Sequence, residues 1–234
     1  MKYYDLHIDS EKLEEIIEMA KLLGFSGIFV NVQNIEERRL NENLKQFLNP
    51  EKNNEIELIR GVIIKAKNKE ELKAQIEKYR RKVEIIAVYG GDYEINRLAC
   101  EDNRVDILYH PELGRNDSGL DHICIKSAAE NNVAIEINFN EILKSKNRPK
   151  ILSFMRKNIK LCKKYEAKII ITSGATEKWE MRAPRELASI GYVLGLDLKD
   201  AIDAVSINPE TKINENREKL KGNIIGNVRI VEEF

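Results

Sequence analysis

The chain has 234 residues, of which 42% are hydrophobic and 33% are charged, and its formal net charge is zero. This composition is typical of one folded domain, and no apolar run approaches the roughly 18 residues that a membrane-spanning helix needs. A neutral chain cannot attract nucleic acid through its overall charge, so any such contact must come from a local patch of basic side chains.

The cysteines and the first residues of the chain indicate the cellular compartment in which we expect the protein. The three cysteines, Cys100, Cys124 and Cys162, are odd in number and have no short paired spacing. We therefore expect neither a disulfide framework nor a cysteine zinc site. The first ten residues, MKYYDLHIDS, lack the apolar segment of a signal peptide, and we expect a cytoplasmic protein.

Apolar segments typical of strands alternate with amphipathic helices along the first half of the chain. Strands are expected at residues 2–8, 27–32, 56–64, 83–89 and 105–109. Asp9 or Ser10 should cap the first helix, which Gly24 ends. A polar helix is expected at residues 35–48. Asn68 and Asp92 are the expected caps of the next two helices.

The second half continues the alternation. We expect a helix that starts at Ser118 with Ile123 and Ser127 on its inner face, and a long helix at residues 149–165. Strands are expected at 133–139 and 168–172. Further helices follow at residues 184–194, which Gly195 ends, and after a cap at Asp197. The regular pattern ends near residue 209, and residues 210–234 form a charged tail, either part of the domain or loosely ordered.

Seven strands in alternation with helices predict a parallel sheet, and polar residues at the strand ends favour a barrel with one functional end. No G-x-G-x-x-G follows the first strand, which disfavours an open dinucleotide-binding sheet. We therefore predict an α/β, TIM-barrel-like fold as a single domain over residues 1–209. It should be imperfect, because no eighth strand is visible.

Several of these strand ends carry residues that could bind a divalent metal. Asp5, His7 and Asp9 are alternate residues around the end of the first strand, so their side chains share a face. The candidates for remnants of a metal site are His7, Asp9, His110 and Glu136. The segments YDLHID, DILYHPE and IEIN resemble the PHP (polymerase and histidinol phosphatase) family of barrel phosphoesterases. However, Asp9 stands where that family has a second histidine. Ser173-Gly174-Ala175 stands where it has an Asp-x-His group. A stand-alone metal-dependent phosphoesterase is therefore the alternative interpretation, with the four residues as remnants of a metal site.

Basic residues favour RNA binding instead. Residues 144–168 contain ten basic residues and one acidic residue, Glu166. Further basic side chains lie in the loop beside the only tryptophan, Trp179. Guanidinium groups match phosphate oxygens with two parallel hydrogen bonds, so arginines in loops suit a nucleic-acid backbone.

Three motifs identify a more specific relative. They are SGLDH at 118–122, AIEIN at 134–138, and ITSGA at 171–175 followed by RAPR at 182–185. In combination they resemble the archaeal ribonuclease P protein component 3 family, which is similar to PHP barrels. The resemblance implies a non-catalytic protein subunit of the ribonucleoprotein that removes the 5′ leader from precursor tRNA.

The same resemblance implies the partners and the contact residues. The RNA of the complex would carry the catalysis with Mg²⁺, and this chain would bind no cofactor. Partners would be the ribonuclease P RNA, precursor tRNA through the complex, and other protein subunits, in a heterotetramer with a second small subunit. The implied RNA-binding residues are Arg97, Arg115, His122, Lys164, Lys178, Arg182 and Arg185. His122 could equally be a capping or core histidine. A protein scaffold without RNA contact is the third interpretation.

Overall fold

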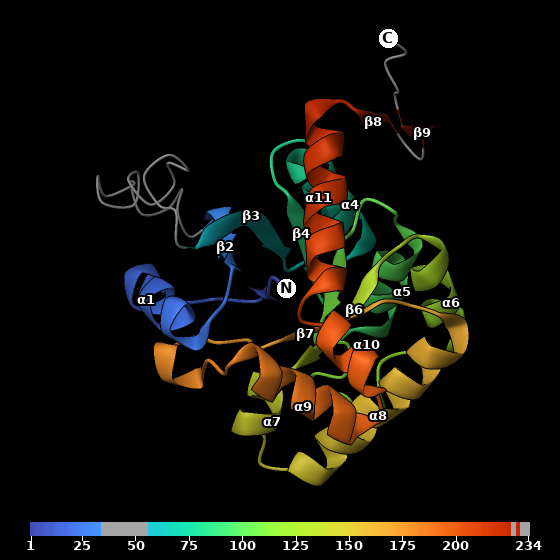
Figure 1. Ribbon diagram of the computed structural model, residues 1–234. Coiled ribbons are helices and arrows are strands. Elements are labelled where there is room, and N and C mark those ends of the chain that lie inside the picture. The colour runs from blue at the N-terminus through green and yellow to red at the C-terminus, as the bar shows by residue number, and fades with distance from the viewer. Residues whose placement is uncertain (34–55, 226–227, 230–234) are drawn as a thin grey trace.

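A computed structural model describes residues 1–33, 56–225 and 228–229, which form a parallel barrel surrounded by helices (Figure 1). Seven strands lie side by side in chain order, and each pairs with its neighbours in parallel. They are β1 (Tyr4–Asp5), β2 (Gly27–Asn31), β3 (Glu57–Ile64), β4 (Ile85–Tyr89), β5 (Ile107–Tyr109), β6 (Ala134–Asn138) and β7 (Ile169–Thr172). The helix expected at 35–48 lies outside the described residues.

Helices connect the strands and cover the outside of the sheet. They are α1 (Leu13–Leu23), α4 (Lys69–Tyr79), α5 (Tyr93–Glu101), α6 (His122–Glu130), α7 (Phe139–Lys144), α8 (Arg148–Tyr165), the 3₁₀ turn η1 (Lys178–Glu180), α9 (Pro184–Leu194) and α10 (Leu198–Asp203). Two predicted caps are confirmed: Asn68 Oδ1 accepts from the Glu71 N–H at 2.9 Å, and Asp92 Oδ1 from the Ile95 N–H at 3.0 Å. Within the described ranges, every helix is too short or too polar to span a membrane.

Alternate side chains of each strand face opposite sides of the sheet, and both sides are buried. Phe29, Ile85 and Ile170 belong to a cluster inside the barrel. Ile86 and Ile171, one residue further along, belong to a larger cluster beneath the helices. Because both faces are covered, the strands are almost continuously apolar, which is why they were predictable from the sequence.

The gap between β7 and β1 is closed without an eighth strand among the described residues. At one end, Ile8 and Ala175 form a parallel bridge, and the Asp9 N–H donates to the Ala175 carbonyl at 3.1 Å. At the other end, the segment after α10 fills the gap: the carbonyls of Ala204 and Val205 accept from the N–H groups of Ile171 and Tyr4, each at 3.0 Å. The predicted imperfect barrel with seven strands is confirmed.

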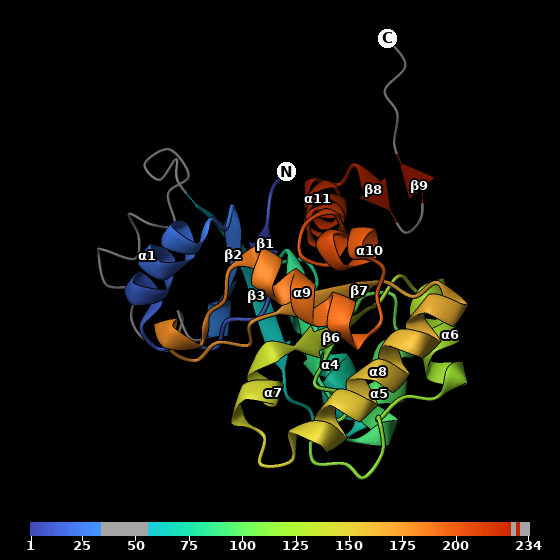
Figure 2. The ribbon, with the colours of Figure 1, turned by 60° about the horizontal axis from the view of Figure 1, so that its bottom comes forward.

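A last helix, α11 (Ile207–Lys221), lies across the amino end of the barrel (Figures 1 and 2). Ile213 joins the cluster inside the barrel, and Asn216 Nδ2 donates to Asp106 Oδ1 and to the Glu84 carbonyl, both at 2.7 Å. The prediction that regular structure ends near residue 209 is therefore wrong. The helix was missed because most of its residues are polar and its apolar period is weak.

The chain after α11 forms a small sheet of its own. Strands β8 (Ile224–Ile225) and β9 (Val228–Arg229) pair antiparallel with each other and do not extend the barrel. The described part of the chain after α11 therefore forms a local pairing.

Three predicted helix starts differ in the structure. Helix α1 begins after Lys12 and has no side-chain cap; Ser10 Oγ instead accepts from the Lys12 N–H just before the helix, at 3.1 Å. Helix α6 begins four residues later than expected because Asp121, not Ser118, caps it. Asp197 stands at the start of α10 without a cap hydrogen bond, and its carboxylate pairs with Lys163 at 2.9 Å.

The inner face of α6 also differs, and one helix was not predicted. Ile123 is 49% exposed, whereas Cys124, Ile125 and Ala128 are buried. The later start rotates the buried stripe by one position. Helix α7 was missed because Asn138 both ends β6 and caps this helix, so no loop separates the two elements.

Candidate functional site at the carboxyl end of the barrel

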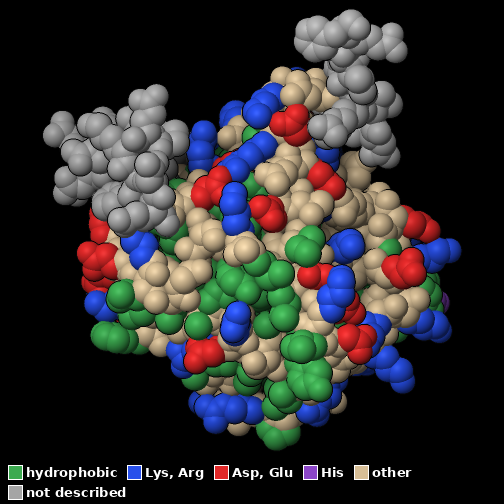
Figure 3. Space-filling view, viewed as in Figure 1, with side chains coloured by type: hydrophobic (Ala, Val, Ile, Leu, Met, Phe, Trp, Pro, Cys, Tyr) green, Lys and Arg blue, Asp and Glu red, His purple; other side chains and the backbone are tan. Residues whose placement is uncertain are grey.

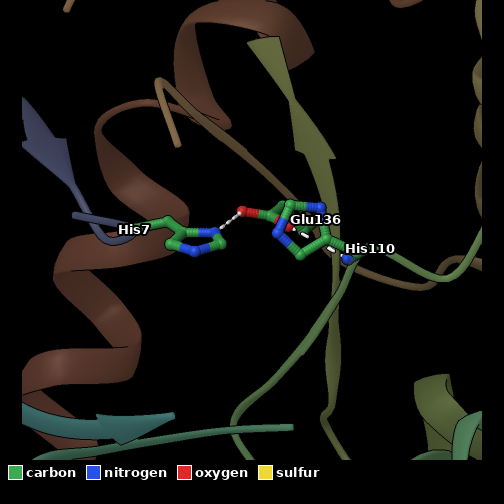
Figure 4. Close-up of side chains that lie close together, drawn as sticks. All are labelled: His7, His110 and Glu136. Atoms are coloured by element: carbon green, nitrogen blue, oxygen red, sulfur yellow. Dashed lines mark hydrogen bonds and ion pairs between the residues drawn. The ribbon is translucent and has the colours of Figure 1, made fainter. Parts of the chain in front are cut away.

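The structure brings His7, His110 and Glu136 together at the carboxyl end of the barrel, with ligand-type atoms within 4.8 Å of one another (Figure 4). His7 follows β1, His110 follows β5, and Glu136 lies on β6. They meet because side chains at the carboxyl ends of barrel strands converge on one mouth. Asp9, the fourth predicted metal-type residue, is not in this group; its Oδ2 lies 3.7 Å from Lys65 Nζ.

Glu136 is the centre of the group. Its Oε1 accepts from Thr172 Oγ1 at 2.6 Å and from Asn138 Nδ2 at 3.1 Å, and lies 2.6 Å from His7 Nδ1. Its Oε2 accepts from the His110 N–H at 3.1 Å. Burial favours the neutral acid, but the nearby imidazoles and hydrogen bonds outweigh it and lower the pKa of Glu136 to about 2.

The two histidines are held by neighbours on both sides. The His7 ring stacks on Tyr109, with centroids 3.9 Å apart and planes 8° apart. His110 has a φ of 49°, in the left-handed region that costs a non-glycine residue energy, and its Nδ1 contacts Glu141 on α7. Burial lowers the pKa of His110, but the charges of Glu136 and Glu141 outweigh burial, so this pKa is raised.

Three further acids are buried at the mouth. Asp5, Glu112 and Glu141 each have one carboxylate oxygen without a hydrogen-bond partner among the described residues. Burial raises the pKa of Asp5 to about 6, and burial with the charge of Glu141 raises the pKa of Glu112 well above its usual range. Burial therefore favours the neutral forms of Asp5 and Glu112.

Sequence reasoning missed Glu112 and Glu141. Glu112 stands in the DILYHPE segment, so the motif held a signal for it. The sequence held no signal for Glu141, because helix α7, which carries it, was not predicted.

The loop after β7 closes the barrel. The Ser173 N–H donates to Asp5 Oδ1 at 3.2 Å, and Ala175 forms the bridge to Ile8. Gly174 has a φ of 63°, and a Cβ added to it would lie 2.3 Å from side-chain atoms of Asn138. Gly174 therefore has no room for a larger side chain, and Ser173 and Ala175 on either side of it are fully buried.

The ligand-type residues at the mouth are hydrogen-bonded to one another and to their neighbours. Only three ligand-type side chains cluster among the described residues, and they already bond to one another or to neighbouring protein groups. A cation would have to displace hydrogen bonds from both oxygens of Glu136. The group is a polar network that links the ends of β1, β5, β6 and β7, beside three acids that each keep an unpartnered oxygen among the described residues.

The predicted RNA-binding residues near α5 and α6 are partly engaged within the protein. Arg97 Nε lies 2.8 Å from Glu101 Oε1, one turn further along α5. Arg115 holds both oxygens of Asp117, at 2.7 and 2.9 Å. His122 is the exposed first residue of α6, and the cap is Asp121. The interpretation of His122 as a capping or core residue is therefore wrong.

The predicted residues after β7 lie in the loop around η1 and at the start of α9. Lys178 Nζ pairs with Glu15 on α1 at 2.9 Å. Arg182 donates to the carbonyls of Trp179 and Met181 at 3.0 and 2.7 Å. Arg185 is exposed and forms no ion pair with any described residue. Trp179 is 71% exposed, so it is not a packing residue of the core.

The seven predicted residues do not form one surface. Arg115, Lys178, Arg182 and Arg185 lie at the carboxyl end of the barrel, because their segments follow strands. Lys164 is at the end of the 18-residue helix α8, next to the start of β7, and so lies at the amino end.

Comparison with known proteins assigns the family. The sequence matches the family described as RNase P subunit p30 over residues 2–221. The chain belongs to this family. It is 44% identical over 176 residues to ribonuclease P protein component 3 of Methanococcus maripaludis (strain S2), which covers 74% of this chain and 75% of that protein. It is 32% identical over 239 residues to the Methanosarcina barkeri protein of the same name, covering 99% and 97%. The resemblance carried by the sequence motifs is confirmed.

Solved structures agree with this assignment. The fold is similar to a chain in the cryo-EM structure of archaeal ribonuclease P with mature tRNA, with a TM-score of 0.79, 28% identity and 98% of both chains covered. It is also similar to a histidinol phosphate phosphatase from Lactococcus lactis, with a TM-score of 0.55 and 15% identity over 86% of this chain and 94% of that one. The second likeness shows a shared fold alone and agrees with the barrel predicted from the sequence.

Proposed function

We propose that this p30-family chain is an RNA-binding, non-catalytic subunit of ribonuclease P. The observation that carries the proposal is the match, over 98% of both chains, to a chain of archaeal ribonuclease P with mature tRNA. In the proposed role the chain supports the RNA that removes the 5′ leader from precursor tRNA in the cytoplasm. The RNA uses Mg²⁺, and this chain binds no cofactor of its own.

The mouth of the barrel supports a binding role over a hydrolytic one. Glu136 is saturated with hydrogen bonds, and the loop after β7 is packed too tightly for further ligands. A hydrolytic centre keeps an open coordination position for water or substrate. The contacts of Glu136 and of this loop argue against such a position.

The loops at the carboxyl end suit an RNA backbone. Arg182 and Arg185 lie three residues apart at the start of α9, beside the exposed ring of Trp179. Guanidinium groups bind phosphate oxygens, and an exposed indole can stack on a base. Lys178 and Arg115 would exchange their carboxylate partners for phosphates, and Arg97, His122 and Lys164 extend the proposed contacts over α5, α6 and α8.

The proposed partners are the ribonuclease P RNA, precursor tRNA through the complex, and other protein subunits in a heterotetramer with a second small subunit. Cleavage of precursor tRNA reconstituted from RNA and proteins, with and without this chain, tests the role directly. We expect cleavage to become faster or to require less Mg²⁺ when the chain is present. Equal cleavage without it would overturn the proposal.

The alternative, a stand-alone phosphoesterase, has its own measurement. The purified chain should be assayed for bound zinc or manganese and for turnover of a phosphate monoester. Stoichiometric metal together with turnover would favour the alternative. We expect neither, because the mouth residues are committed to one another.

A further inference from the structure

A cavity of about 720 Å³ opens at the amino end of the barrel, opposite the mouth. Its walls come from the segments that precede β4, β5 and β6 and from the last turns of α11. Six basic residues line it: Arg80, Arg81, Arg104, Lys212, Lys219 and Lys221. Among the described residues, two acids, Asp106 and Glu130, line the same cavity.

Both acids are already occupied by other partners. Asp106 Oδ2 accepts from Arg80 and from the Ile86 N–H, each at 2.7 Å, and Oδ1 accepts from Asn216 at 2.7 Å. Glu130 lies 3.8 Å from Lys126, one turn earlier on α6. Arg104 pairs with Asp102 and Glu77, and Lys221 pairs with Glu218. The lining bases without an ion pair among the described residues are therefore Arg81, Lys212 and Lys219.

Lys212 is the unusual member of this group. It is only 6% exposed, and its ammonium donates to the carbonyl of Asn132, yet no carboxylate of the described residues lies within ion-pair distance. Buried lysines are almost always paired with an acid. An ammonium group has three donors, so two remain for a ligand. Burial lowers the pKa of Lys212, against the opposing charges of Asp106 and Glu215, which agrees with a missing counter-ion.

Arg81 and Lys219 stand at the rim of the cavity. Both side chains are exposed, and neither forms an ion pair within the described part of the chain. Lys219 also meets the negative end of the α11 dipole, which is reason enough for a basic residue there. That reason does not extend to Lys212, which lies more than two turns before the end of α11.

Surface charge alone would not have marked this cavity. On the face that α11 crosses, basic and acidic side chains are interspersed (Figure 3). The cavity is distinguished by how its charged groups are paired. Its acids are bonded to other groups, and its buried lysine, Lys212, has no carboxylate partner among the described residues.

We infer that this cavity binds a phosphate group, with Lys212 inside it and Arg81 and Lys219 at its rim, and that the phosphate belongs to an RNA backbone. A phosphodiester supplies the negative charge that Lys212 lacks and oxygens for its remaining donors. The RNA source rests on the proposed function. RNA would then contact both ends of the barrel, at Arg185 on one end and at this cavity on the other.

The first experiment measures binding of ribonuclease P RNA to the full chain as a function of salt. The variant Arg81→Gln/Lys219→Gln removes two unpaired basic groups without touching the core. The matched control, Lys67→Gln/Lys69→Gln, removes two exposed lysines at the opposite end of the barrel, around the start of α4. We expect the cavity variant to lose about one unit of salt slope for each phosphate contact removed, and the control to keep the slope of the unmodified chain.

The second experiment uses inorganic phosphate without RNA. Thermal melting at constant ionic strength should show a rise in Tm with phosphate, because a ligand that binds only the folded state stabilises it. Lys212→Met, which removes the buried ammonium at similar length, should abolish this rise. If Lys212→Met fails to fold, Arg81→Gln/Lys219→Gln is used in its place.

The outcomes of these experiments distinguish the inference about the cavity from the proposed function of the chain. Equal salt slopes for the cavity variant and the control overturn the inference. Equal slopes with a phosphate-dependent Tm that Lys212→Met lacks would assign the cavity to free phosphate, and so would also overturn the RNA source. Failure of the chain to support cleavage or to bind RNA would overturn the proposed function, while the melting experiment would still report on the cavity.

Discussion

The two ends of the barrel handle buried charge in opposite ways. At the carboxyl end, acids and histidines are in excess, and Glu136 receives hydrogen bonds on both oxygens. At the amino end, α11 covers the barrel with Ile213, and a buried lysine beside it lacks an acid. At the carboxyl end, Glu136 is paired on both oxygens, but Asp5, Glu112 and Glu141 each keep one oxygen without a partner among the described residues. At the amino end, the buried group without an ion pair among the described residues is the ammonium of Lys212. The comparison teaches that histidines and carboxylates that stand out in the sequence, such as His7 and Glu136, can serve to hold strands together. A lysine that does not stand out in the sequence, Lys212, can indicate a ligand.

The largest effect should come from breaking the network at the mouth. Glu136→Gln removes the negative charge and turns one accepting oxygen into a donor facing His7, Thr172 or the His110 N–H. Removing one partner of a buried ionic or hydrogen-bonded group costs about 3–5 kcal/mol. Urea unfolding should show this loss, and the exposed Glu70→Gln should stay within about 0.5 kcal/mol of the unmodified chain. A loss below about 1 kcal/mol would mean that the mouth is not a stabilising network.

The amino end should depend on apolar packing instead. Ile213→Ala leaves a hole beneath α11 and should lower the free energy of unfolding by about 2–4 kcal/mol. The control in the same helix, Ile207→Ala, concerns a side chain that is 46% exposed and should cost less than half as much. Equal, small effects in urea unfolding would show that α11 does not share the stability of the barrel.

Asp5 and Glu136, two acids of the mouth, should change the stability of the chain with pH in opposite directions. The pKa of Asp5 is raised from 3.8 to about 6, so the folded chain gains stability as pH falls through 6 toward 3.8. The pKa of Glu136 is lowered from 4.5 to about 2, so stability is lost as pH falls from 4.5 toward 2. Asp5→Asn keeps an acceptor for the Ser173 N–H and should stabilise the chain by about 2 kcal/mol at pH 8.

The measurement is a series of urea titrations between pH 4.5 and pH 8. Asp5→Asn should flatten the alkaline side of the profile, and Asp200→Asn, on the exposed side of α10, should not. An unchanged slope in Asp5→Asn would show that Asp5 is ionised normally in the folded chain.

The smallest effect concerns single arginines at the carboxyl end. Arg185 has no ion pair among the described residues, whereas Arg97 is paired with Glu101 at 2.8 Å. Arg185→Gln should therefore lower the salt slope of RNA binding by about one unit, and Arg97→Gln by less. Filter binding at several salt concentrations checks this order. The reverse order would place the main RNA contact on α5 instead of α9.

The sequence predicted most strands because a strand buried on both faces is apolar by itself, as in Ile169–Thr172. It also predicted caps whose partners are local, such as Asn68 and Asp92. It did not predict α11, whose apolar contact depends on Ile213 reaching the inside of a barrel built by residues far away in the chain. At the mouth, His7, His110 and Glu136 were foreseen from strand ends, but Glu112 and Glu141 were not.

By itself, the sequence determined the alternation of strands and helices, the family, and the small residues after β7. These are properties of short segments, which local periodicity and motifs express directly. Only the tertiary structure decided which charges meet: that Glu141 contacts His110, that Arg115 is held by Asp117, and that Lys212 is buried without an acid. The physical reason is that burial and pairing depend on the register of strands and the packing of helices, which bring together groups that lie far apart in the sequence.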